Sequence, residues 1–115
     1  QDYRGALADY NQAIQLRPDF AVAYSFRGDL KVDRLQDYRG ALADFNRAIS
    51  IGSSLAIAYG SRGSLKHDRL KDRAGGIADV QQAARLFKQQ GDLENHQTAI
   101  GLLKKWQQTG KNSGR

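Results

Sequence analysis

The eight residues DYRGALAD occupy positions 2–9 of this 115-residue chain and occur again at positions 37–44. A diverged copy, DRAGGIAD, follows at positions 72–79, so that each copy begins 35 residues after the one before it. Aligning residues 2–36 with residues 37–71 gives 21 identities in 35 positions. A period of this length is typical of stacked repeats, in which each copy forms one structural unit.

Both halves of each unit carry apolar residues at helical spacing. Tyr3, Leu7 and Tyr10 lie at i, i+4 and i+7 of the first half, which places them on one helix face. Pro18 follows this stretch, and a helix must have ended before it. The pattern therefore predicts an all-α chain of about six helices arranged in pairs, at 3–16, 20–34, 37–51, 55–69, 72–89 and 92–108.

The spacing of aromatic and small residues resembles that of the tetratricopeptide repeat, and in particular the Arg-Gly variants common in bacterial proteins. The family's signature is an aromatic residue, a glycine four residues later, Ala-x3-aromatic-x2-Ala in the second helix, and a proline near its end. The matching residues are Tyr24, Gly28, Ala41, Phe45 and Ala48, then Tyr59, Gly63, Gly76, Val80 and Ala83, preceded by Ala6, Tyr10, Ala13 and Pro18. The resemblance implies a right-handed superhelical solenoid of antiparallel helix pairs.

On this resemblance, residues 1–109 form one tetratricopeptide-like domain. The expected segments are the second helix of a truncated first repeat at 1–19, repeats at 20–54 and 55–90, a capping helix at 91–109 and a flexible basic tail at 110–115. Each unit has 35 residues against the family's usual length of about 34, with the extra residue between Gly28 and Tyr38. The second helix at 72–89 diverges most, so its packing is the hardest to predict. The chain does not start with Met, and we expect a fragment of a longer protein.

The composition excludes several classes of site. The chain has no Cys, which excludes disulfides and thiolate metal sites, and no apolar run long enough to span a bilayer. The net charge is +6, but Lys104, Lys105, Lys111 and Arg115 supply +4 of it at the end of the chain. Residues 1–103 are nearly balanced, with 14 basic and 12 acidic side chains, which argues against nucleic-acid binding by the folded body.

No constellation of catalytic or metal-binding residues is recognisable. His67 and His96 lie in different predicted helices, and neither has a carboxylate or a second His at a spacing suited to a metal. The glycines of the repeated word follow no predicted strand and precede no Lys-Ser/Thr, so they form no phosphate-binding loop. We therefore expect no enzymatic activity and no cofactor, and we expect His67 to be a partly buried residue at a helix end.

Basic residues recur in the two repeats and form what we call the basic stripe: Arg27, Lys31, Arg34, Arg62, Lys66 and Arg69. One interpretation is a ladder that binds the phosphates of a nucleic acid or an anionic surface. The other is structural, in which Arg27 pairs with Asp44 and Arg62 pairs with Asp79, while Asp9 lacks such an arginine. The joint recurrence of Arg and Asp favours the structural interpretation, in which an exposed pair would contribute about 0–1 kcal/mol.

The resemblance also implies a concave groove, lined by the first helix of each pair, that holds extended or helical peptides. We call its lining the candidate groove residues: Val22, Ser25, Phe26, Asp29, Asp33, Ile57, Gly60, Ser61, Ser64 and Asp68. The set contains no Lys or Arg, so the family's clamp for the C-terminal carboxylate of chaperone tails is not expected. Its aspartates favour a peptide with Lys or Arg beside an apolar anchor for Phe26 or Ile57. The alternative is that these aspartates only solvate an unused surface.

The helix predicted at 3–16 has an apolar face and no helix before it in the sequence. Burying one Leu-sized side chain stabilises a protein by roughly 1.5–3 kcal/mol, so this face should be covered. Two hypotheses remain open: a second copy covers the face in a homo-oligomer, or an upstream helix of a longer protein does.

These observations predict a protein–protein interaction module that binds a peptide or partner protein in its groove and performs no chemistry. The alternatives are nucleic-acid or anionic-surface binding through the basic stripe, and a purely architectural or oligomerisation role in a longer protein. The sequence identifies neither partner nor compartment, and a soluble cytoplasmic protein without membrane insertion is the default expectation.

Overall fold

The computed structural model describes residues 2–113, with side chains for residues 2–109. Over this range the chain forms six α-helices and no strand, which confirms the predicted all-α architecture. The elements are α1 (Tyr3–Leu16), α2 (Ala21–Leu30), α3 (Tyr38–Ile51), α4 (Ala56–Asp68), α5 (Arg73–Gln89) and α6 (Leu93–Ser113), and a π-helical turn, η1 (Lys31–Leu35), extends α2.

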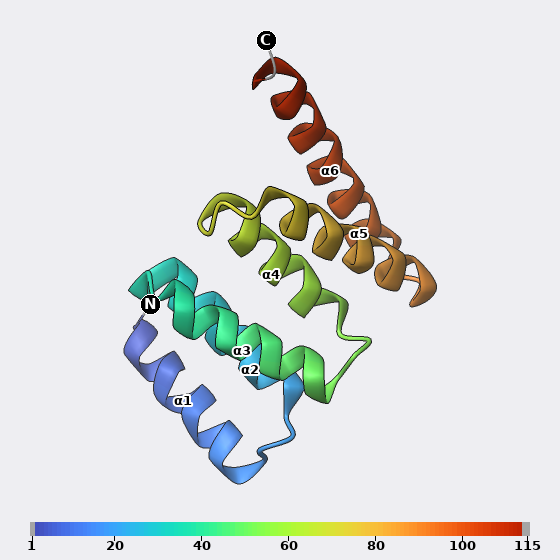
Figure 1. Ribbon diagram of the computed structural model, residues 1–115. Helices are drawn as coiled ribbons and strands as arrows, with labels where there is room; N and C mark the ends of the chain where they lie inside the picture. Colours follow the sequence, from blue (N-terminus) through green and yellow to red (C-terminus); the bar gives the residue numbers. More distant parts are fainter. Residues whose placement is uncertain (1, 114–115) are drawn as a thin grey trace.

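The helices stack side by side into an elongated body with extents of 49 × 31 × 26 Å (Figure 1). Each helix packs against the next one along the chain, and α2 and α4, the first helices of the two complete pairs, also contact each other. The last turns of α6, beyond Trp106, extend past the stack (Figure 1). The order of contacts is that of a solenoid, in which each unit touches only its neighbours.

The aspartate that opens the repeated word begins the second helix of each pair. The carboxylate of Asp37 accepts a hydrogen bond from the backbone N–H of Gly40 at 2.9 Å, and Asp72 accepts one from Gly75 at the same distance. Asp2 caps α1 through a hydrogen bond from the backbone N–H of Arg4, at 3.0 Å. Such a cap satisfies an otherwise unpaired helical N–H and contributes about 1 kcal/mol to stability. The word therefore fixes where α1, α3 and α5 begin.

The extra residue of each unit is accommodated where the first helix ends. The backbone N–H of Asp37 donates to the carbonyl of Lys31 at 3.0 Å, a span one residue longer than in the common helix-terminating motif. Gln36 reverses the chain in the left-handed conformation, with φ of 49°. Lys71 repeats this conformation one unit later, with φ of 57°. The π-helical turn thus lies between Gly28 and Tyr38, where the extra residue was expected from the sequence.

Paired helices approach closely at glycines. A Cβ atom at Gly28 would lie 2.6 Å from the ring of Phe45, which is fully buried. In the next pair Val80 takes the place of Phe45, and a Cβ atom at Gly63 would lie 2.7 Å from Val80 and 2.8 Å from the carbonyl oxygen of Gly76. The backbones of α4 and α5 therefore come together around the smaller valine, and the diverged α5 is closely packed.

Helix α6 covers the end of the stack through Trp106. The indole is 5 % exposed and stacks on the ring of His67, with centroids 3.8 Å apart and an interplanar angle of 5°. Arg73 adds a hydrogen bond from Nη2 to the carbonyl of Trp106 at 3.0 Å. His67 is partly buried near the end of α4, as predicted.

Helix α6 also extends past its predicted end at residue 108. It includes residues 110–113, which the sequence assigned to a flexible tail, while residues 114–115 of that tail lie outside the described residues. No proline interrupts this segment, and the hydroxyl of Thr109 donates to the carbonyl of Lys105 at 3.0 Å, as it does inside a helix. No helix in residues 2–113 combines the length and the apolar character needed to cross a bilayer.

Candidate functional site

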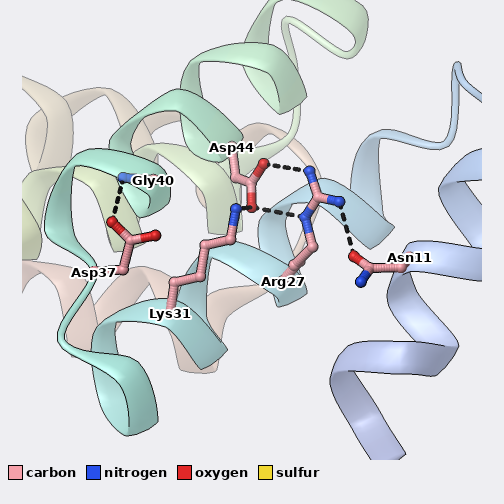
Figure 2. A network of polar contacts seen from close by, with 6 residues as sticks. All are labelled: Asn11, Arg27, Lys31, Asp37, Gly40 and Asp44. Carbon is pink, nitrogen blue, oxygen red and sulfur yellow. Dashed lines mark hydrogen bonds and ion pairs between the residues drawn. The ribbon is translucent and has the colours of Figure 1, made fainter. Parts of the chain in front are cut away.

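Arg27 connects three successive helices through its guanidinium. From α2 it donates two hydrogen bonds to Asp44 on α3, from Nε to Oδ2 at 2.9 Å and from Nη2 to Oδ1 at 2.7 Å. Its Nη1 donates to Oδ1 of Asn11 on α1 at 3.0 Å, and Lys31 adds an ion pair to Asp44 at 3.0 Å (Figure 2). The coupling of Arg27 to Asp44 predicted from the repeat spacing is therefore present.

The next unit repeats this network with the same geometry. Arg62 donates to both oxygens of Asp79, at 2.7 and 2.8 Å, and to Asn46 at 2.9 Å. Lys66 pairs with Asp79 at 3.2 Å. The asparagine in each network belongs to the preceding pair, so each arginine sets the position of one repeat against the next.

Burial makes these pairs different from the exposed pairs that the sequence suggested. The side chain of Asp44 is 6 % exposed and that of Arg27 is 19 % exposed. Burial alone would raise the pKa of Asp79, but the hydrogen bonds and charges of Arg62 and Lys66 outweigh it and hold that pKa below its ordinary value. The expected contribution of about 0–1 kcal/mol applies to exposed pairs, and these pairs are largely buried. Removing one partner of a buried pair is expected to cost about 3–5 kcal/mol.

The networks also engage most of the basic stripe. Arg27, Lys31, Arg62 and Lys66 are held by buried carboxylates, so four of its six cations already have partners. The other two members are Arg34 and Arg69, both exposed. The guanidinium of Arg69 lies 5.6 Å from the ring centroid of Tyr38.

Three adjoining hollows follow the first helices along the stack, and we name them by the elements that enclose them. The α1–α2 hollow has a volume of about 710 Å³, the α2–α4 hollow about 360 Å³ and the α4–α6 hollow about 180 Å³. Asp29 and Asp33 line both the first and the second hollow, and Gly60 and Ser64 line both the second and the third. The candidate groove residues that line at least one hollow are Phe26, Asp29, Asp33, Gly60, Ser61, Ser64 and Asp68.

Three candidate groove residues do not line these hollows. Ser25 is fully buried, and its hydroxyl has no hydrogen-bond partner among the described atoms, so its assignment to an open lining is corrected. Val22 and Ile57 are partly buried on α2 and α4. Helical spacing places Ser25 next to Phe26, but it does not show which of the two points inward. That depends on how α2 is rotated against its neighbouring helices.

The lining also contains basic residues that the sequence analysis placed elsewhere. Arg34 lines the α1–α2 hollow and Arg69 lines the α2–α4 hollow, so the expectation of a lining free of Lys and Arg is wrong. Both residues follow the glycine of their unit by six positions, near the end of the first helix. The π-helical turn moves Arg34 around the helix axis relative to a regular α-helix, which the sequence period does not reveal.

Asp29 is one of two carboxylates, with Asp33, that line both the α1–α2 hollow and the α2–α4 hollow. Burial raises its pKa, a hydrogen bond with Ser61 opposes the rise, and the nearby Asp33 carboxylate adds to it. Among the described residues no basic side chain forms an ion pair with Asp29. Its charged form is therefore incompletely compensated, and a cation entering the hollow would stabilise it.

The histidines offer no metal site in the described part of the chain. His67 stacks on Trp106, and Nδ1 of His96 donates to the carbonyl of Ala84 at 2.8 Å. No group of three or more His, Cys, Asp or Glu side chains between residues 2 and 109 is placed to hold a metal ion.

Comparison with known proteins identifies the fold. No protein-family model matches the chain, and no curated protein matches its sequence significantly. The chain is similar in structure to the first tetratricopeptide domain of Spaghetti (RPAP3) bound to the HSP90 peptide SRMEEVD, with a TM-score of 0.78 and 23 % identity over 93 % of this chain and 79 % of that one. It is also similar to the TPR2B domain of yeast Sti1 in a complex with pHsp70, with a TM-score of 0.83 and 22 % identity over 94 % of this chain and 85 % of that one. The fold is thus of the tetratricopeptide type.

Proposed function

We propose that this chain is a protein-interaction module that binds a peptide segment of another protein along the α2–α4 hollow. The occupant carries Lys or Arg, and its cationic group lies beside Asp29. The single observation that carries this proposal is the position of Asp29, a partly buried carboxylate that lines the α2–α4 hollow and forms no ion pair with any described residue. Burial also raises its pKa. Such a group is costly for the free protein and favourable once an ammonium or guanidinium reaches it.

The α2–α4 hollow has the composition of a recognition surface. Asp29, Asp33 and Asp68 give it three carboxylates against one guanidinium, that of Arg69. Val32, which is partly buried, supplies apolar contact in the same hollow, whereas Leu65 is 2 % exposed and belongs to the core. A peptide with a basic residue next to an apolar residue satisfies both features, because charge complementarity gives specificity while the apolar contact contributes most of the affinity.

The two structural neighbours support binding of peptides by this fold, and the charge of the hollow sets this chain apart from one of them. The peptide in the RPAP3 complex, SRMEEVD, has three acidic residues. Three carboxylates in the α2–α4 hollow would repel such a peptide. The proposed partner therefore differs from that chaperone tail in the sign of its charge.

The experiment compares two labelled hexapeptides that differ only in charge, one with Lys and Arg around a central Leu and one with Glu at the same positions. Fluorescence anisotropy with the full chain should show saturable binding of the basic peptide and none of the acidic one. Asp68→Asn should weaken the basic peptide by about tenfold if one close charge pair is lost. Asp19→Asn is the matched control, since that carboxylate is 78 % exposed and lies outside the three hollows.

Two outcomes would reject the proposal. Equal affinity for both peptides, or equal loss in Asp68→Asn and Asp19→Asn, would show attraction by overall charge rather than by the hollow. Binding of single-stranded RNA that weakens steeply with salt, with no binding of either peptide, would favour the basic stripe as the functional surface instead.

A further inference from the structure

Helices α1 and α3 occupy equivalent positions in successive repeats. The α1–α2 hollow lies on the face of α1 that corresponds to the face of α3 covered by α2. Adding 35 to the numbers of Ala6, Asp9 and Tyr10, which line this hollow on α1, gives Ala41, Asp44 and Phe45 on α3. Two of these residues contact the first helix of their pair: Phe45 packs against Gly28 of α2, and Asp44 binds Arg27 of α2 and Lys31 of the π-helical turn. The contacts between α2 and α3 therefore show which residue types can pack against the equivalent surface of α1.

The residues on α3 are buried, whereas the equivalent residues on α1 are not. Ala41 and Phe45 are 0 % exposed and Asp44 is 4 % exposed. On α1 no residue is buried, and Asp9 is exposed. The same residue types that form the core between α2 and α3 are thus partly open to water on α1, and the hollow above them is the largest of the three.

The hollow is also strongly acidic. Asp2, Asp9, Asp29 and Asp33 line it, against the single guanidinium of Arg34. Asp9 forms no ion pair with any described residue, whereas Asp44 and Asp79, its equivalents in the other units, each bind one arginine and one lysine. A matching occupant must therefore bring cations to Asp9.

We propose that the α1–α2 hollow is the docking site for an amphipathic helix of a partner protein that carries Arg-Gly-x-x-Lys, the spacing of Arg27, Gly28 and Lys31. Its glycine lies against the ring of Tyr10, which takes the place of Phe45, and its arginine and lysine bind Asp9. Complementary charge and the existing α2–α3 contact both specify this occupant. The two hollows share Asp29 and Asp33, but Asp9 and Tyr10 line only the α1–α2 hollow, so variants at these two positions test this proposal separately from the peptide in the α2–α4 hollow.

The probe is a labelled peptide with the sequence of residues 19–36, DFAVAYSFRGDLKVDRLQ, which reproduces α2 and its π-helical turn. We expect saturable binding to the full chain and protection from hydrogen exchange in α1. Asp9→Asn in the protein should weaken binding by about tenfold or more, because it removes the negative charge that would pair with the arginine and lysine of the peptide. Asp9 is exposed, so the variant should fold as the wild type does.

Two altered peptides and one protein variant serve as controls. Peptides with R27Q and K31Q, or with G28L, should lose binding, the first through lost charge and the second through a clash with Tyr10. Asp68→Asn should leave binding of the wild-type peptide unchanged, because Asp68 lines the α2–α4 hollow and not this one.

Three results would overturn the proposal. The first is the absence of binding to a protein whose folding is verified by circular dichroism. The second is binding that is insensitive to Asp9→Asn or that protects α3 instead of α1, since the peptide would then act elsewhere. The third is concentration-dependent self-association of the chain that protects α1 without peptide, because a second copy would then be the occupant.

Discussion

Arg27 and Asp44 are joined by two parallel hydrogen bonds, of 2.9 and 2.7 Å, in a part of the stack where the aspartate is almost inaccessible to water. Because Arg62 and Asp79 repeat the arrangement, the relationship is a property of the repeat and not of one site. The same guanidinium reaches Asn11 on α1, so a single side chain aligns three helices (Figure 2). We infer that these arginines stabilise the stack and set the register between repeats.

Truncation of this arginine should be costly. In Arg27→Ala the carboxylate of Asp44 stays buried with only Lys31 as a partner, and we expect a loss of about 3 kcal/mol in the free energy of unfolding. The triple variant Arg27→Met/Lys31→Met/Asp44→Leu should recover most of that loss, since all three charges of the buried network are then removed. Urea unfolding measures both. A loss below about 1 kcal/mol for Arg27→Ala would mean that the pair behaves as an exposed one.

Acid should weaken the fold through Asp79. Arg62 and Lys66 outweigh the effect of burial and lower its pKa below 3.8, so the stabilisation is complete above that unfolded value and is lost as the pH falls through the folded pKa. Asp29 acts in the opposite sense, because its raised pKa costs stability at neutral pH and this cost disappears on acidification. Urea unfolding between pH 7 and pH 2 should therefore show a smaller acid loss in Asp79→Asn than in the wild type. Parallel curves for the two proteins would contradict this assignment.

Two glycines, one on α4 and one on α6, should change stability in opposite directions when replaced by alanine. Gly101 lies inside α6 with no atom near its missing Cβ, so Gly101→Ala should raise stability by about 0.5–1 kcal/mol. Gly63 faces the backbone of Gly76, and Gly63→Ala should lower stability by about 1–3 kcal/mol. Thermal unfolding of the two variants provides the comparison. A stabilised Gly63→Ala would show that α4 and α5 are less closely packed than described.

Removal of the Trp106 ring should release α6 from the stack. Trp106→Ala eliminates the contact with His67 and leaves a cavity beside Val80, and losses of about 3–5 kcal/mol are typical for such changes. Amide exchange should accelerate in α6 and the end of α4 while α2 and α3 keep their protection, because a stack of repeats can open at one end. Trp106→Phe should show a smaller effect. Uniform acceleration along the whole chain would instead indicate a single cooperative unit.

The sequence period predicted the helix pairs, their order and the Arg–Asp coupling, because these features depend on residue types that recur at fixed spacing. The same period could not show that Ser25 points inward while Phe26 is exposed, since helix rotation depends on packing with two neighbouring helices. It also missed Arg34 and Arg69 in the lining. The π-helical turn changes the direction of the Arg34 side chain, and Arg69 lies one residue past the end of α4, where helical spacing no longer gives the direction of a side chain. The hydrogen bond between Asp29 and Ser61 joins two adjacent repeats. It could not be predicted, because this pair of residues does not recur in the next repeat.

The most direct test of the proposed function is whether the α2–α4 hollow prefers a positively charged side chain to an uncharged one at a single peptide position. Isothermal titration at pH 7 would compare a basic peptide with its analogue in which the contacting Lys is replaced by uncharged norleucine, for the wild type and for Asp29→Asn. If the ammonium binds beside Asp29, the wild type should prefer Lys by about tenfold, and Asp29→Asn should bind both peptides equally. An unchanged preference for Lys in a folded Asp29→Asn variant would contradict the assignment of Asp29 as the recognition residue.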